Sequence, residues 1–210
     1  RSCVQAFRGA GKSWITSAFA CWNWLMDPQK NILVVSASKT RADDFSTFTQ
    51  RLIHELPILE HLKPRDDQRS SKVSFDVGPA RASHAPSCKS MGITSQLTGS
   101  RADLIIADDV ESANNSQTQL MRDRLSETVK EFDSIIKPEV GRIIFLGTPQ
   151  TELSIYNQLE ERGFTTQIWP ARFPENKAII NYGKKLAKSV IENKQNLKPG
   201  QALDPDRFDD

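Results

Sequence analysis

The sequence predicts an α/β fold with a mainly parallel sheet flanked by helices, and three observations support this. Continuous apolar runs at Ile32–Val35, Leu104–Ala107 and Ile143–Leu146 are typical of buried central strands. Segments with apolar residues three and four positions apart, the spacing of an amphipathic helix, alternate with these runs. Polar clusters follow the strands, at the edge where open α/β sheets bind their ligands.

Two strands and two helices are predicted in the first 56 residues. Cys3–Phe7 and Asn31–Ala37 have the composition of short buried strands. A helix is predicted over Ser13–Met26, with an apolar stripe made of Trp14, Ala18, Cys21, Trp22 and Leu25. A second helix is predicted over Thr40–Leu56, and Pro57 follows it.

The alternation resumes after an irregular excursion. Residues 63–101 hold only short apolar pieces between Ser, Pro, Gly and Arg, so we expect small strands and loops there. A long amphipathic helix is predicted over Ser116–Ile136, between the second and third apolar runs. A helix over Leu153–Glu161 and a strand over Phe164–Trp169 complete the pattern.

Length and composition bound the class of protein. The chain has 210 residues, a net charge of +2 and 38% hydrophobic residues, which predicts one globular domain. No apolar run approaches the roughly 18 residues of a membrane span, and no signal peptide opens the chain. Because the net charge is close to zero, the overall charge of the chain does not indicate nucleic-acid binding. Because the chain starts at Arg1 and runs straight into an apolar segment, we expect it to be a piece of a longer protein.

The three cysteines are widely spaced. Cys3, Cys21 and Cys88 show neither a pairing pattern nor metal-ligand spacing. His84 lies four residues before Cys88, but no second pair completes a tetrahedral site. We therefore expect reduced thiols and no structural metal.

Residues 6–13 come close to the phosphate-binding loop pattern G-x-x-x-x-G-K-[ST]. They are Ala6, Phe7, Arg8, Gly9, Ala10, Gly11, Lys12 and Ser13, with Ala6 in place of the first Gly. The backbone N–H groups of such a loop wrap the β-phosphate, and Gly11 lets the backbone approach closely. Lys12 is expected to contact the β- and γ-phosphates of ATP, and the Ser13 hydroxyl to ligate Mg²⁺. A strand before the loop and a helix after it argue against a chance match, and predict a P-loop NTPase.

An acid pair follows the second apolar run. Asp108 is predicted to hold Mg²⁺ through its water shell. Asp109 stands where Glu is usual in such proteins and is one methylene shorter. The catalytic acid that orients the attacking water is therefore either Asp109 or Glu111.

Two further groups are candidate catalytic residues. Arg8, inside the loop, can stabilise transition-state charge on the γ-phosphate as an arginine finger does. Thr148 follows the third apolar run, where its hydroxyl can bind the γ-phosphate or its water and report hydrolysis to the next segment. The structural alternatives are that Arg8 is a solvent-exposed loop residue and that Thr148 belongs to an ordinary turn after a strand.

The ordered set of motifs resembles the large terminase subunits of tailed bacteriophages, especially those of short-tailed phages like T7. Beside the loop and the acid pair, the resemblance is carried by Val34–Ala42, Gln96–Asp103, Phe145–Gln150, Trp169–Arg172 and Asp204–Phe208. It implies a RecA-like fold of the additional-strand (ASCE) kind. It also implies that Arg8, Asp108 and Thr148 have the roles given above, and that Arg101 acts in trans on a neighbour's nucleotide.

The resemblance further implies what this domain does and with what. It implies an ATP-hydrolysing motor domain that drives double-stranded DNA into an empty capsid in the cytoplasm of an infected bacterial cell. The implied partners are the portal protein, the small terminase subunit and further copies of the chain in a ring. Residues 1–173 would form the ATPase core, truncated at its N-terminus, and residues 174–210 a linker or small subdomain leading to a nuclease domain absent from this chain.

Two alternatives from other classes remain open at this stage. A superfamily 2-type helicase would share both phosphate motifs, and a nucleotide-binding scaffold protein would hydrolyse nothing. DNA contact itself is ambiguous. The excursion from Lys63 to Arg101 holds seven Lys or Arg against three Asp, a local net charge of +4, which suits a phosphate-gripping loop as well as an ordinary surface. The tail lysines between residues 184 and 198 are equally ambiguous.

Overall fold

The computed structural model describes residues 1–149, 151–192, 197–206 and 208, and it contains one seven-stranded sheet. The strand order is β3-β4-β2-β5-β6-β1-β7. Every neighbouring pair is parallel except β3 with β4, which is antiparallel. The strands are β1 (Ser2–Ala6), β2 (Ile32–Ser36), β3 (Ser74–Phe75), β4 (Cys88–Gly92), β5 (Leu104–Asp108), β6 (Arg142–Gly147) and β7 (Thr165–Trp169). The predicted mainly parallel sheet is confirmed.

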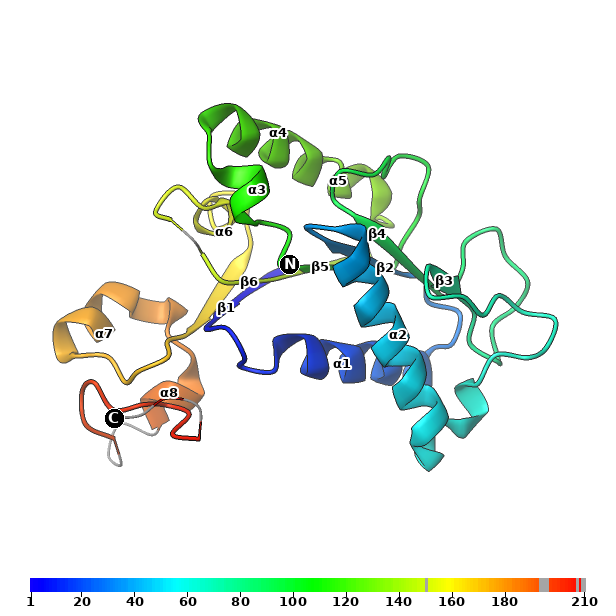
Figure 1. Cartoon of the computed structure of the whole chain (residues 1–210), viewed down its shortest axis with the longest axis horizontal. Coiled ribbons are helices and arrows are strands. Elements are labelled where there is room, and N and C mark those ends of the chain that lie inside the picture. Colours follow the sequence, from blue (N-terminus) through cyan, green and yellow to red (C-terminus); the bar gives the residue numbers. More distant parts are fainter. Residues whose placement is uncertain (150, 193–196, 207, 209–210) are drawn as a thin grey trace.

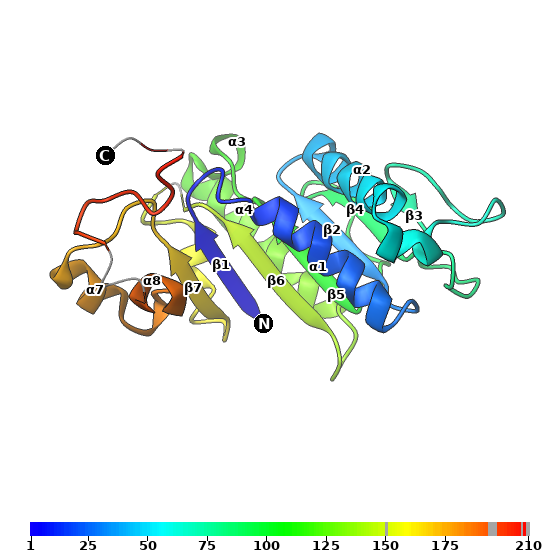
Figure 2. The same ribbon diagram turned by 90° about the horizontal axis from the view of Figure 1, so that it is seen from below.

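Helices cover both faces of this sheet. The helical elements are α1 (Lys12–Met26), α2 (Lys39–Glu55), η1 (Pro57–Leu62), α3 (Ala113–Ser116), α4 (Gln119–Lys130), α5 (Phe132–Ile135), α6 (Ile155–Gln158), α7 (Asn176–Tyr182), η2 (Gly183–Lys185) and α8 (Lys188–Glu192). Figure 1 shows α1 and α2 on one side of the sheet and α3 to α6 on the other. Figure 2 shows α1 and α2 in front of the strands, with α7 and α8 beyond the β7 edge. The result is a three-layer α/β sandwich.

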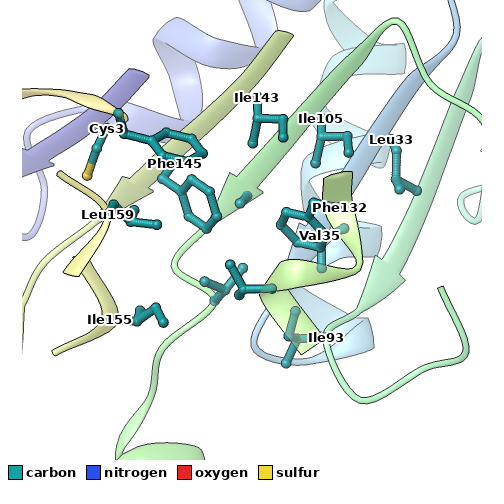
Figure 3. Packing of buried hydrophobic residues seen from close by; sticks show 14 of the residues in the cluster. Cys3, Leu33, Val35, Ile93, Ile105, Phe132, Ile143, Phe145, Ile155 and Leu159 are labelled. Carbon is teal, nitrogen blue, oxygen red and sulfur yellow. The ribbon is translucent and has the colours of Figure 1, made fainter. Parts of the chain in front are cut away.

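Alternate side chains of the central strands enter two different cores. In β2, Leu33 and Val35 pack into the core beneath α4, α5 and α6, and Val34 packs into the core beneath α1 and α2. Because successive strand residues point to opposite faces, a strand covered on both faces must be apolar throughout. In the first core, the Phe145 ring stacks on Phe132 with centroids 5.8 Å apart (Figure 3). Phe145 also meets Phe164 edge-on, with centroids 5.2 Å apart.

The single long helix predicted over residues 116–136 is wrong, because the chain forms two helices there, α4 and α5, and the short α3 ends at Ser116. Ser112 caps α3, exchanging hydrogen bonds with Asn115. Thr118 then starts α4 anew, since its side chain accepts a hydrogen bond from the Met121 N–H. Polar side chains such as Ser and Thr favour the start of a new helix over the interior of a longer one. The spacing of apolar residues gives no sign of such a break. The helix predicted over Leu153–Glu161 is likewise shorter, being α6 alone.

The excursion contributes more to the sheet than expected. Its segment Cys88–Gly92 forms β4, which pairs in parallel with β2 along five residues. Its side chains alternate, with Cys88 and Ser90 buried and Lys89 only half-buried. A strand that carries Lys and Ser has no continuous apolar run, so its place in the sheet follows only from its pairing with β2.

Only part of the apolar stripe predicted for α1 is buried, since Cys21 lies in the core but its two tryptophans do not. Trp14 is 68% exposed and Trp22 49% exposed, whereas Trp24 is fully buried. The Trp24 indole N–H donates to the Lys30 carbonyl at 3.1 Å, and its ring meets Phe75 edge-on. Apolar residues lie around most of this helix, so spacing alone could not identify the face that meets the sheet.

A third hydrophobic cluster lies beside β7. Phe173, Leu186, Ala187 and Val190 form a small hydrophobic cluster separate from the two main cores. Trp169, at the end of β7, packs against this cluster. The polypeptide after β7 therefore has a core of its own.

The corrected orientation of α1 predicts unequal effects of two matched substitutions. Trp24→Ala is expected to lower the free energy of unfolding by about 3–5 kcal/mol, because it empties a fully buried site. Trp22→Ala should cost less than half as much, since half of that side chain is already in solvent. Urea denaturation of the two variants measures the difference, and equal losses would contradict the orientation described.

Candidate phosphate-binding site

The parallel register brings the polar strand ends to one edge of the sheet. Val4, Leu146 and Asp108 lie side by side on β1, β6 and β5. Ser36 of β2 pairs with Asp108 on the next strand along. The phosphate loop, the acid pair and the Gly147–Thr148 turn therefore leave the sheet at one edge, as the sequence predicted.

The loop after β1 has the backbone that phosphate binding requires. Gly9 and Gly11 have φ values of 86° and 72°, in the left-handed region that favours glycine. Gly11 is also the N-cap of α1, so the first free N–H groups of that helix lie directly after the loop. Nothing lies within 4 Å of a Cβ built on Gly11, so its requirement is conformational rather than steric.

Lys12 is held inside its own loop. Its Nζ donates to the carbonyls of Ala6 at 3.0 Å and Phe7 at 3.1 Å, and to the Thr148 hydroxyl at 3.3 Å. Burial lowers the pKa of Lys12, an effect that the nearby carboxylates of Asp109 and Asp108 oppose. The ammonium thus lies between the β1 and β6 strand ends.

Ser13 and Asp108 form the polar centre of the site. The Ser13 hydroxyl donates to Asp108 Oδ2 at 2.7 Å, joining the first turn of α1 to the end of β5. Burial raises the pKa of Asp108, with a further contribution from the like charge of Asp109, while the bond from Ser13 opposes the shift.

These two side chains fit a divalent cation. Asp108 Oδ1 is buried and has no hydrogen-bond partner among the described residues. A buried carboxylate oxygen without a partner is costly, and Mg²⁺ prefers oxygen ligands from one or two carboxylates, hydroxyls and phosphates. Ser13 and Asp108 are therefore the residues of this chain that would hold the ion.

The two candidate catalytic acids differ in their surroundings. Asp109 adopts a φ of 46°, and its backbone binds both neighbouring strand ends, donating to Leu146 and accepting from Ala37. Glu111 is only 5% exposed, and its Oε2 accepts hydrogen bonds from Ser154 Oγ at 2.9 Å and from the Ile155 N–H at 2.7 Å. Both acids line the same cavity.

That cavity measures about 990 Å³ and brings together all the predicted site residues except Phe7 and Ala10. Arg8 lies on its wall beside Gly9, and Thr148 lines it from the end of β6. The Thr148 hydroxyl donates to the Ala6 carbonyl at 2.8 Å. The Phe7 ring lies outside the cavity and meets Phe208 edge-on, with centroids 5.3 Å apart.

Sequence reasoning missed several residues of the wall. Arg41 and Asp44 line it from the start of α2, and the Trp14 and Phe48 rings, 4.4 Å apart between centroids, line it from α1 and α2. Ser36 and Arg41 follow the first apolar run, so the rule that ligands lie at strand ends could have found them. The apolar spacing of α1 places Trp14 on a buried stripe, which hides its position on the cavity wall.

Arg101 and the basic excursion lie elsewhere. Arg101 precedes β5, at the opposite end of that strand from Asp108, and donates to the Ser134 carbonyl at 2.9 Å. Within the excursion, Arg65 donates to the carbonyls of Gly78 and Ala80, and Arg69 pairs with Asp76. These arginines hold the excursion together. Gln150, Lys194 and Arg207, which also belong to the motifs and tail lysines named above, lie outside the described residues.

Other site classes find no support in the described part of the chain. All three cysteines are free and buried, and burial raises the pKa of Cys21 to about 12. No group of three or more His, Cys, Asp or Glu side chains there could hold a metal ion. No described helix is long and apolar enough to cross a membrane.

Fold and site together define a P-loop NTPase, and comparisons with known proteins narrow the class. Residues 6–135 match the family described as "Terminase large subunit, T4likevirus-type, N-terminal". The chain is 53% identical over 212 residues to the "Terminase, large subunit" of Enterobacteria phage T3, a match that covers 98% of this chain and 36% of the T3 protein. The chain therefore belongs to the terminase large subunit family, and it spans about a third of the length of this curated relative.

A solved structure supports the fold independently. The N-terminal domain of the DNA packaging ATPase from bacteriophage phi29 superposes with a TM-score of 0.50 at 14% identity, covering 77% of this chain and 80% of that one. At this identity the likeness concerns the fold alone. The RecA-like class and the family resemblance inferred from the sequence are confirmed.

The burial of Asp108 predicts a gain in stability on its neutralisation. Asp108→Asn should raise the thermal midpoint without Mg²⁺ or nucleotide by about 2 °C or more, because a buried charge is removed and a domain of this size gains roughly 2–4 °C per kcal/mol. The raised pKa means that the wild-type chain loses stability as pH rises from the ordinary Asp value of 3.8 through the folded pKa. The gain should therefore be larger at pH 7 than at pH 4.

Calorimetry at both pH values measures this effect. Asp44→Asn is the matched control, since Asp44 lines the same cavity but is exposed. A lower midpoint for Asp108→Asn than for Asp44→Asn at pH 7 would contradict the assignment of a destabilising buried charge.

Proposed function

We propose that this chain is the ATP-hydrolysing motor domain of a phage terminase large subunit, coupling hydrolysis to translocation of double-stranded DNA into an empty capsid. The observation that carries the proposal is the convergence of Lys12, Ser13, Asp108 and Thr148 in one cavity of a chain of this family. These are the groups that phosphoryl transfer requires at the end of a parallel sheet.

Each residue has a definite task in this proposal. The backbone of residues 7–13 and the Lys12 ammonium bind the β- and γ-phosphates of ATP, for which Lys12 must leave its present carbonyl partners. Ser13 and Asp108 hold Mg²⁺, which when bound neutralises phosphate charge. Arg8, on the cavity wall, stabilises charge that develops on the transferred group. Thr148 is hydrogen-bonded to both Lys12 and the Ala6 carbonyl, so it responds when phosphate binds to the loop.

Glu111 suits the role of catalytic acid better than Asp109. Its Oε2 is held by two donors, which fixes the carboxylate, while its buried Oε1 has no hydrogen-bond partner within the described residues. A fixed carboxylate with one unpartnered oxygen suits this role, and Oε1 must become accessible in order to orient an attacking water. The Asp109 backbone, in contrast, ties the ends of β2 and β6 together.

The same proposal extends to the assembly and its partners. We infer that copies of the large subunit form a ring on the portal protein, supplied with DNA through the small subunit, in the cytoplasm of the infected cell. Residues 1–173 form the ATPase core, and residues 174–210 form a small subdomain that leads toward a nuclease domain. The separate cluster of Leu186, Ala187 and Val190, which Phe173 joins from the last position of the core, supports a small subdomain here.

Family membership favours this function over a superfamily 2-type helicase, which would share the two phosphate motifs. A scaffold that binds nucleotide without hydrolysis is distinguished by experiment. The described basic residues of the excursion make no separate case for DNA contact, because several are engaged in holding their own loops.

Loss of the loop lysine tests the proposal. Lys12→Ala is expected to reduce Mg²⁺-dependent ATP hydrolysis by about 1,000-fold or more, because the charge that pairs with the β- and γ-phosphates is lost. Lys130→Ala, on the exposed side of α4, is the matched control and should hydrolyse ATP at the wild-type rate. The rate of phosphate release measures ATP hydrolysis by both variants.

The same pair of variants, placed in the complete large subunit, tests the motor. DNA packaged into purified empty capsids should be lost with Lys12→Ala and kept with Lys130→Ala. Near-zero hydrolysis by the unmodified protein would instead support a scaffold protein that binds nucleotide without hydrolysing it. Hydrolysis without packaging would leave an ATPase but contradict the proposed motor function.

Two acid substitutions separate the candidate catalytic acids. Glu111→Gln is expected to reduce kcat about 100-fold with little change in KM for ATP, since the amide no longer attracts the water proton. Asp109→Asn should reduce kcat by about tenfold at most, through the backbone turn that it occupies. Steady-state kinetics decides the order, and a larger loss for Asp109→Asn would reverse the assignment.

A further inference from the structure

The Glu111 carboxylate is held by a segment that no motif of the sequence singled out. Ser154 and Ile155, which donate the two hydrogen bonds to Oε2, lie 43 and 44 residues later in the chain. Ser154 is only 1% exposed, so its hydroxyl is shielded from competing water. A hydrogen bond from a buried hydroxyl to a carboxylate is stronger than one at the surface.

The next residue holds the backbone of the same glutamate. The Tyr156 hydroxyl accepts a hydrogen bond from the Glu111 N–H at 3.3 Å, and this side chain is 1% exposed. Burial raises the pKa of Tyr156, so the hydroxyl stays neutral. The run 154–156 therefore fixes both the carboxylate and the main chain of Glu111.

Tyr156 is itself seated on the end of β6. A Cβ added to Gly147 would lie 2.1 Å from Tyr156 Cζ, so only glycine leaves room for the ring. The Tyr156 carbonyl also accepts a hydrogen bond from Gln5 Nε2 of β1 at 3.3 Å. The residue that holds Glu111 is thus packed between the strand ends that lead to Thr148 and to the phosphate loop.

This arrangement leaves Glu111 one defined orientation. With Oε2 saturated by two donors, rotation of the carboxylate would break both bonds. Oε1 is enclosed and has no hydrogen-bond partner in the part of the chain that the structure describes. A group that must direct a reacting water within a few tenths of an ångström needs such support from residues that do not touch the substrate.

We propose that Ser154 and Tyr156 are positioning residues that hold Glu111 in its catalytic orientation and link that orientation to the Gly147–Thr148 strand end. The inference rests on the proposed function, with Glu111 as the catalytic acid. It assigns to the segment after Thr148 a second task beside sensing the phosphate, namely alignment of the acid.

Removal of one donor tests the proposal by kinetics. In the full chain, Ser154→Ala should reduce kcat for ATP about tenfold and change KM less than twofold, because ground-state binding at the loop is untouched. Ser154→Thr keeps the hydroxyl and should restore the rate to within about twofold of the wild type. Tyr156→Phe, which removes only the acceptor for the Glu111 N–H, should give a smaller loss of the same kind.

A transition-state analogue supplies a readout that a structural role would not change. ADP with aluminium fluoride places a planar group where the phosphoryl transfers, so Ser154→Ala should weaken its binding about tenfold and leave ADP binding as in the wild type. Ser134→Ala, an exposed serine on α5 far from the cavity, is the matched control. Should Ser154→Ala lose its cooperative thermal transition, Tyr156→Phe undergoes the same measurements.

The outcomes separate the two levels of inference. If hydrolysis depends on Lys12 but both variants show wild-type kcat and analogue affinity, the positioning role is overturned and the proposed function stands. The positioning role is also overturned if ADP and its aluminium fluoride complex weaken equally, or if Ser154→Thr is as impaired as Ser154→Ala. If the wild-type chain shows no hydrolysis that depends on Lys12, the proposed function itself fails.

Discussion

The site depends on the parallel pairing of β6 with both β1 and β5. In this register Val4 of β1 and Asp108 of β5 both lie opposite Leu146 of β6. The phosphate loop and the acid pair therefore lie at the same level along the strands. A slip of one residue would turn every side chain of β6 to the other face and move Thr148 away from Lys12. Since β6 is covered on both faces, packing rather than burial alone fixes this register: a Cβ in the place of Gly147 would lie 2.1 Å from Tyr156 Cζ.

The polar centre of the molecule opposes the stability of the fold. Asp108 is a buried charged group and Lys12 a half-buried one, and the pKa of each is shifted toward the neutral form. Two apolar cores offset this cost, since the strands that hold these groups bury side chains on both faces. Phosphoryl transfer needs preorganised charge next to a rigid sheet, so under the proposed function the stability cost and the activity would have the same origin.

The strand ends also explain how occupancy of the loop can reach the rest of the domain. Lys12 bonds the carbonyls of its own loop and the Thr148 hydroxyl. In the proposed function, phosphate binding to Lys12 would alter these hydrogen bonds, and Thr148 precedes the segment whose residue Ser154 holds Glu111. A short chain of directional contacts thus joins the loop, the β6 end and the acid, with the Tyr156 ring packed on Gly147 at its centre.

The sequence by itself determined the layers of the fold and the chemical nature of the site. Continuous apolar runs identify strands buried on both faces, and Gly11, Lys12, Ser13 and Asp108 are recognisable because their chemistry is local to one strand end each. Only the tertiary structure decided which face of α1 is buried, that Lys89 lies in a parallel strand, and that Arg41 lines the cavity. It also decided which residues hold Glu111. The reason is physical: spacing along a chain reports contacts within one element, whereas the partners of Glu111 come from a segment 43 residues away that only strand pairing brings near.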